Sequence, residues 1–171
     1  RLRDLAARFD VWQHEPFGIS FLHPKGWLVS PSLGEDRALI SVQRDGADPL
    51  GWFDTPRLFV WVQRNTPFPR SSQPELAAKI ARLVEARMAT AGMEPRNLTA
   101  GLAQRGSRAA PEHRMLATAP ETRFQGSLIL RTRIMGDGAV VTIGYACTAG
   151  DEESVRALFT EFSRSLSVRT R

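Results

Sequence analysis

The residues with the most reactive side chains in this sequence are one cysteine and three histidines. Cys147 stands in an apolar run with no basic residue beside it, a setting typical of a buried thiol rather than a nucleophile. His14, His23 and His113 lack the short spacing of metal-ligand motifs. His14 is followed by a carboxylate, but no serine or cysteine nucleophile motif accompanies that pair. The sequence therefore predicts no catalytic residue, no metal site and no cofactor, and it indicates a protein that is not an enzyme.

The charged residues favour a protein partner over nucleic acid. The chain has 171 residues with 23 Lys and Arg against 18 Asp and Glu, a formal net charge of +5. The excess is spread along the chain and is densest over residues 103–133. Nucleic-acid-binding proteins concentrate their cations on one helix or face, because many phosphates must be neutralised together. We therefore expect a solvated basic surface and no nucleic-acid binding.

Six residues make up the candidate contact surface. Four are arginines in or beside the basic stretch, and two are aromatic residues in a polar loop. Exposed aromatic residues in a loop suggest a binding surface, and the alternative is that this loop folds back over the sheet. The candidates are Arg114, Arg123, Arg131, Arg133, Trp52 and Phe53.

The length indicates one domain. A chain of 171 residues is close to the size of a single domain. No apolar run approaches the roughly 18 residues that a membrane-spanning helix needs. We expect residues 1–14 to form a tether or a short helix and residues 15–171 to form a single domain. The chain opens at Arg1 without a methionine, so a leader or a membrane tether upstream is compatible with the sequence. The sequence leaves the oligomeric state open.

Alternating apolar residues predict strands separated by turns rich in proline and glycine. In residues 57–63 both alternating sets are apolar, which predicts a central strand covered on both faces. The predicted strands span residues 17–22, 27–30, 38–43, 57–63, 97–104, 112–119, 127–135 and 138–148.

Two amphipathic helices complete the predicted elements. The first follows Ser72, which matches a capping box with Glu75, and it ends at Gly92. The second covers residues 151–168 and opens with acidic residues, which favour the positive end of a helix dipole. The first helix has the apolar stripe Leu76, Ile80, Leu83, Val84, Met88 and Ala91. Short connections favour antiparallel pairing, so we expect an α+β fold: an αβα sandwich in which a long mid-chain helix and a C-terminal helix pack on one antiparallel sheet of about six to eight strands.

A hairpin near the end of the chain sets the position of two candidate arginines. A two-residue loop at residues 136–137 would place Thr132 opposite Val141. The same register would leave Arg131 and Arg133 on the half-exposed face of the hairpin.

Two segments carry a resemblance to a known fold. One is an aromatic strand followed by Pro-x-Gly-Trp, FGISFLHPKGW over residues 17–27; the other is YACTA over 145–149 with a helix ending in FTEFSRSL over 159–166. With the order of elements, they resemble the PsbP-like fold, the αβα sandwich of the extrinsic photosystem II protein, of a Ran-release factor, of bacterial LpqN-type lipoproteins and of some secretion-effector chaperones. The resemblance covers roughly residues 15–168 and implies no catalytic residues, because members of this fold bind different proteins.

Two functional hypotheses follow. The first is a non-enzymatic protein-binding or adaptor domain, the soluble part of an exported bacterial protein, with an extracytoplasmic or membrane-tethered location favoured by the lipoprotein resemblance. The second is a small-ligand carrier or cryptic hydrolase with a cleft between helix and sheet and His14, His23 or His113 as its polar group.

Overall fold

The computed structural model describes residues 2–44, 53, 55–65, 68–98, 112–119 and 124–169. Within these ranges the helices are α1 (Leu2–Arg8), α2 (Gln73–Thr90) and α3 (Glu152–Ser165), with short 3-10 helices η1 (Glu15–Phe17), η2 (Arg70–Ser72) and η3 (Ala149–Asp151). The strands are β1 (Phe9–His14), β2 (Ile19–Pro24), β3 (Trp27–Leu33), β4 (Arg37–Arg44), β5 (Arg57–Gln63), β6 (Glu94–Asn97), β7 (Glu112–Ala119), β8 (Phe124–Ile134), β9 (Val140–Thr148) and β10 (Ser167–Val168).

The strands form two antiparallel sheets. The larger has seven strands in the order β3-β4-β5-β9-β8-β7-β6, and the smaller has three in the order β1-β2-β10. The predicted α+β fold with an antiparallel sheet is confirmed, but the expectation of one sheet is wrong. The chain leaves the small sheet at the turn after β2, where Gly26 has a φ of 76° that favours glycine.

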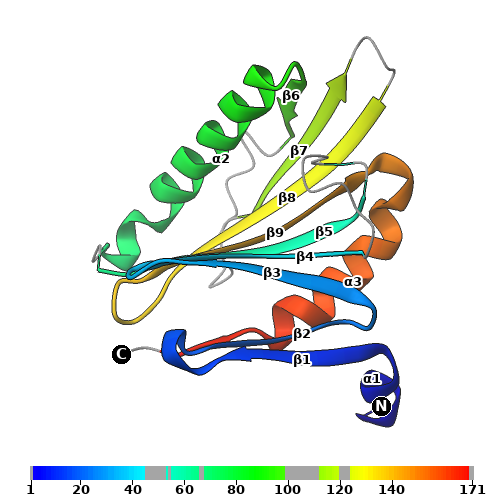
Figure 1. Cartoon of the computed structure of the whole chain (residues 1–171). Helices are drawn as coiled ribbons and strands as arrows, with labels where there is room; N and C mark the ends of the chain where they lie inside the picture. The colour runs from blue at the N-terminus through cyan, green and yellow to red at the C-terminus, as the bar shows by residue number, and fades with distance from the viewer. Residues whose placement is uncertain are drawn as a thin grey trace.

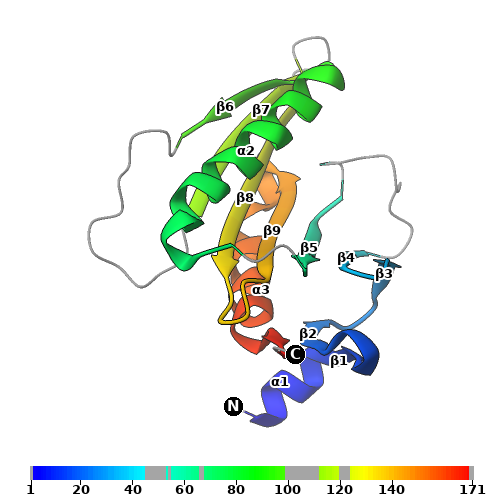
Figure 2. The same ribbon diagram turned by 90° about the vertical axis from the view of Figure 1, so that its left-hand side faces the viewer.

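The helices lie on opposite faces of the seven-stranded sheet. α2 packs across β6, β7 and β8, while α3 packs against β9 on the other face and also contacts β2 of the small sheet. Figures 1 and 2 show this layering, with α2 on one side of β8 and β9 and α3 on the other. The second layer on the α3 face is therefore a helix and a small sheet together.

Each face of the seven-stranded sheet has its own apolar core. The core on the α3 face includes Ile40, Val60, Ile143, Phe159 and Phe162. The core on the α2 face includes Phe53, Met88, Met115, Leu128 and Leu130. Because both faces are covered, all nine residues of β9 except the last are buried.

The buried side of α2 differs from the predicted stripe. Its buried residues include two alanines, which allow the helix axis to approach the sheet, whereas Leu83 is 59% exposed and the prediction that it belongs to the stripe is wrong. The predicted capping box is also absent, because Ser72 Oγ donates to the carbonyl of Pro69 at 2.7 Å and makes no cap bond to the helix. The buried residues are Ala77, Ile80, Ala81 and Met88.

The register of the β8–β9 hairpin is one residue away from the prediction. Thr132 pairs with Thr142 rather than Val141. The loop has a third residue, Gly138, whose φ is 83° and whose N–H donates to the carbonyl of Met135 at 3.0 Å. A glycine in this left-handed conformation is typical of three-residue hairpin loops. The extra loop residue moves every pair by one position.

The N-terminal segment is part of the fold from Phe9 onward. β1 pairs with β2 along its whole length, Phe9 is buried, and Trp12 stacks on Phe21 at 5.1 Å between ring centroids. The expected tether or short helix over residues 1–14 is thus a short helix, α1, followed by β1, whose aromatic residues pack against the small sheet, and the domain boundary at residue 15 stays a prediction.

Candidate functional site

Five arginines gather on the α3 face of the large sheet, on β6, β7, β8 and the first turns of α3. They lie at the part of this face that α3 leaves open, and each is at least partly exposed. We call this surface the arginine shelf: Arg96, Arg114, Arg131, Arg133 and Arg156.

The strand register places the shelf on one face. Arg96 pairs with Leu116, and Leu116 with Ser127, which in turn pairs with Cys147 of the core on the α3 face. Directly paired residues of neighbouring strands project to the same face, and residues two positions apart along a strand share it. The arginines of β6, β7 and β8 therefore follow one diagonal across the three strands.

Glu152 is the acidic centre of the shelf. Arg114 Nη2 donates to its two carboxylate oxygens at 2.8 and 2.9 Å, and Arg156 Nη2 donates to Oε1 at 2.7 Å. Tyr145 Oη donates to the same oxygen at 3.3 Å. One carboxylate thus holds two guanidinium groups, which leaves a local excess of positive charge.

A second ion pair anchors Arg131. Its Nε donates to Glu112 Oε2 at 2.5 Å, and the two residues are direct neighbours across β7 and β8. Its guanidinium lies 5.0 Å from the ring centroid of Phe159 on α3. The carboxylate and the ring compensate the charge, while the side chain stays 38% exposed.

Ionisation of the groups around Glu152 follows from burial and charge. Burial opposes ionisation of Glu152, but the hydrogen bonds from Arg156 and Arg114 outweigh it and hold its pKa below the usual range. Burial, with a smaller contribution from Glu152, raises the pKa of Tyr145 to about 12. Burial followed by the nearby carboxylates also raises the pKa of Cys147 to about 12, so this cysteine remains a thiol at neutral pH.

Three of the six sequence-predicted contact residues meet on the shelf. Arg131 and Arg133 lie on β8 with Arg114 on the neighbouring strand. Arg131 pairs with Ile143 and Arg133 with Val141 of β9, one residue away from the pairs of the predicted register, and both side chains are partly exposed, as that register expected. Arg123 and Trp52 lie outside the described residues.

Phe53 does not belong to an exposed surface. Its side chain is 2% exposed in the core on the α2 face. A Cβ added to Gly126 of β8 would lie 2.5 Å from Phe53 Cδ1, so the ring sits directly on that strand. The expectation of a contact role for Phe53 is wrong, and the alternative, a residue folded back over the sheet, describes it.

Two shelf residues were missed from the sequence. Arg156 follows Glu152 by four residues on a predicted helix, a spacing that places both side chains on one helix face and could have identified the pair. Arg96 had no such signal, because its place depends on the pairing of β6 with β7.

The three histidines do not converge. His14 Nδ1 accepts from the N–H of Phe17 at 3.2 Å at the end of β1, and His23 is buried at the far end of β2. His113 lies on the β7 face that α2 covers, where burial lowers its pKa and Glu85 partly offsets the effect. The three histidines therefore do not line one common ligand site among the described residues.

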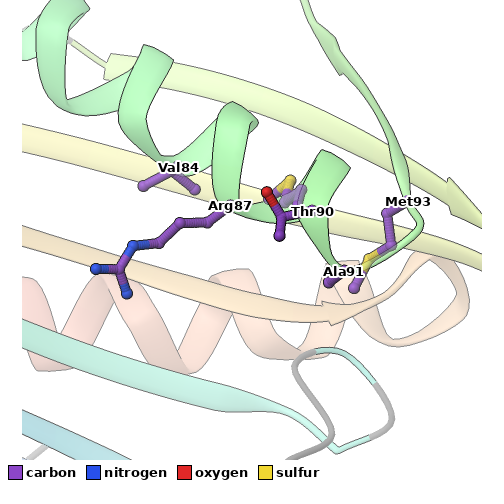
Figure 3. A pocket seen from close by; sticks show the side chains of 6 residues that line it. Val84, Arg87, Thr90, Ala91 and Met93 are labelled. Carbon is purple, nitrogen blue, oxygen red and sulfur yellow. The ribbon is translucent and has the colours of Figure 1, made fainter.

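Two grooves border α2. The one at its N-terminal end has a volume of about 450 Å³, within the range of roughly 300–1,000 Å³ for small-molecule sites, but it is shallow and open and none of the three histidines is among the described residues that line it. The one at its C-terminal end has a volume of about 280 Å³ (Figure 3). None of the three histidines is among the described residues that line it: Val84, Arg87, Met88, Thr90, Ala91 and Met93. These grooves give little support to a ligand carrier.

Two kinds of feature are absent from the described ranges. These ranges contain no group of three or more His, Cys, Asp or Glu side chains arranged to hold a metal ion. They also contain no helix long and apolar enough to cross a membrane.

Comparison with known proteins shows the fold. The chain is similar to the solution structure of cyanobacterial PsbP (CyanoP) from Synechocystis sp. PCC 6803, with a TM-score of 0.54 and 10% sequence identity. The match covers 95% of this chain and 94% of the cyanobacterial one. No family model and no curated protein matches the sequence. The chain therefore has a PsbP-like fold, in agreement with the resemblance seen in its sequence.

Proposed function

We propose that this chain is a non-enzymatic protein-binding domain that holds an acidic segment of a protein partner on the arginine shelf. The observation that carries the proposal is the gathering of five partly exposed arginines, four of them on one diagonal of the sheet, around the two carboxylates that pair with them, Glu152 and Glu112. Arginine suits this task because its planar group binds carboxylates with two parallel hydrogen bonds.

The arrangement of the shelf supports a preorganised site. Arg114 and Arg131 are held by Glu152, Glu112 and the ring of Phe159, so an incoming carboxylate would not have to order them. Arg96 and Arg133 extend the shelf as exposed cations at its two ends. An extended acidic segment lying along the diagonal would contact both the arginines that are already held in place and the two exposed arginines at the ends.

The test is binding of a labelled glutamate-rich peptide to the full chain, measured by fluorescence anisotropy at low salt. The double variant Arg96→Gln and Arg133→Gln should weaken binding about tenfold, since each exposed ion pair contributes up to about 1 kcal/mol. The matched control is Arg82→Gln with Arg87→Gln on α2, which removes the same charge from the opposite face and should leave the affinity nearly unchanged.

Three outcomes would overturn this proposal. They are equal weakening by the shelf and control variants, tighter binding of a single-stranded oligonucleotide than of the peptide, and turnover on an ester, peptide or phosphoester panel that one substitution abolishes. Loss of peptide binding as salt rises is expected, because exposed charges are screened.

We also infer that the domain acts outside the cytoplasm, as the soluble part of an exported bacterial protein. The resemblance to bacterial lipoproteins motivates this, and the full-length precursor tests it. A signal sequence or lipidated cysteine ahead of Arg1 is expected, and recovery of the tagged precursor in the cytoplasmic fraction alone would overturn it.

A further inference from the structure

The sheet edges of the described chain differ in how they are protected. The two edges of the large sheet, β3 and β6, contain Pro31 and Pro95. β10 at one edge of the small sheet is only two residues long. Proline and shortness are common ways to block pairing with another chain. β1, at the other edge of the small sheet, has six residues without proline and lies at the lower margin of the molecule in Figure 1.

The hydrogen bonds around β1 show which backbone groups point outward. The carbonyl of Arg8 accepts from the N–H of Lys25 at 3.0 Å, so residues 8, 10, 12 and 14 face β2. The N–H of Leu22, whose register partner is Val11, instead points away from β1 to Ser165 Oγ at 2.8 Å. Because strand residues alternate, the N–H and C=O groups of residues 9, 11 and 13 point to the free edge.

We propose that β1 pairs with β1 of a second copy of this chain, antiparallel and centred on Val11. In this register Val11 faces Val11, and Phe9 faces Gln13 of the other copy, which joins the two small sheets into one of six strands. Val11 is 67% exposed in the single chain, and the pairing places the two Val11 side chains in contact on one face of the joined sheet. This inference goes beyond the proposed function and does not depend on it.

Charge complementarity favours the second copy as the occupant. Arg8 stands at one end of β1 and Glu15 just beyond the other. Antiparallel pairing about Val11 brings the end of β1 that follows Arg8 next to the end that precedes Glu15 of the second copy, twice, so opposite charges flank the strand pair, whereas parallel pairing would bring like charges together. Glu15 is 67% exposed beside Arg169 at 3.5 Å, so its carboxylate is accessible. No two like charges of β1 lie directly opposite each other in this register.

The experiment is sedimentation equilibrium of the full chain at low salt over a wide range of protein concentration. A monomer–dimer equilibrium is expected. Val11→Pro should raise the dimer dissociation constant at least about tenfold, since both central hydrogen bonds are lost. Its far-UV circular dichroism and Tm should stay near those of the parent, because this N–H has no backbone partner among the described residues and proline is tolerated at such an edge.

Further variants separate pairing from folding defects. Val11→Lys should weaken the dimer equally and does not depend on proline being tolerated. Leu28→Lys on β3 is the matched control, 50% exposed on another edge strand, and should not weaken it. Arg8→Glu should weaken the dimer, and adding Glu15→Arg should restore it. A chain that stays monomeric at every concentration, a dimer unaffected by Val11→Lys, or one disrupted equally by Leu28→Lys would overturn the proposal.

Discussion

The two faces of the seven-stranded sheet are covered differently. On the α3 face, α3 and the small sheet share the task, and Ile40, Val60 and Phe162 have no exposed surface. On the α2 face, α2 packs on β6, β7 and β8, while Leu28 and Leu39 on β3 and β4 remain about half exposed at 50% and 48%.

The difference follows from dimensions. Seven strands about 4.8 Å apart span roughly 30 Å, whereas a helix is about 10 Å wide with its side chains. One helix therefore covers about three strands, and the remainder of each face needs another element or polar residues. On the α3 face the remainder, over β6, β7 and β8, is the arginine shelf; on the α2 face the remainder, over β3 and β4, is partly apolar.

The largest expected effect comes from opening the fully covered face. Phe162→Ala should destabilise the fold by about 3–5 kcal/mol, because the ring is completely buried and packs edge-on against Phe21 at 5.0 Å. Leu39→Ala on the other face should cost less than about 1 kcal/mol. Urea unfolding of both variants measures the contrast, and equal losses would contradict the difference between the faces.

A smaller loss of stability is expected from adding a side-chain atom where two strands of the large sheet pack tightly. A Cβ at Gly144 of β9 would lie 2.1 Å from the carbonyl oxygen of Ile129 and 2.5 Å from Phe59 Cζ. Gly144→Ala should therefore destabilise the protein by about 1–3 kcal/mol, since the backbone of β8 cannot move aside. Gly150→Ala, whose nearest atom would be 3.9 Å away, is the control and should change the Tm little.

The smallest effect concerns the ion pairs of the shelf. The folded-state pKa of Glu152 is lowered, so its contribution to stability is present above the unfolded pKa and is lost as pH falls through the folded one. Glu152→Gln should destabilise the protein at neutral pH by at most about 1 kcal/mol, because its arginine partners are solvent-exposed.

The difference in stability between the parent and Glu152→Gln should shrink steadily as the pH falls below the ordinary pKa of a glutamate side chain. Urea unfolding of the parent and of Glu152→Gln at several pH values measures it. The exposed neighbour Glu153, changed to Gln, is the matched control. A gap between parent and Glu152→Gln that is constant with pH would show that the carboxylate charge is not the cause.

Local elements were predictable where the apolar pattern was strong. Residues 57–63 and 112–119 form strands at the predicted boundaries. In residues 57–63 the run that is apolar on both sides fits a strand covered on both faces. The hairpin register was not predictable, since the loop length decides it and Gly136, Asp137 and Gly138 suit both two and three residues. The place of Phe53 was equally undecided, because the same loop sequence suits an exposed or a folded-back ring.

The candidate site was predictable in part. Arg114, Arg131 and Arg133 were singled out by local charge density, which a sequence displays directly. Their neighbours Arg96 and Arg156 join them through β6–β7 pairing and the packing of α3, contacts between residues far apart in the chain.

The sequence by itself determined the number and type of most elements, the absence of a membrane-spanning run and the lack of a reactive motif, because these depend on residue type and short-range periodicity. The tertiary structure decided that the first two strands and the last form a separate sheet, that four arginines of β6, β7 and β8 share one diagonal and that β1 has a free edge among the described strands. Such features arise from the order in which strands pair, and pairing order is set by contacts over the whole chain rather than by any local pattern.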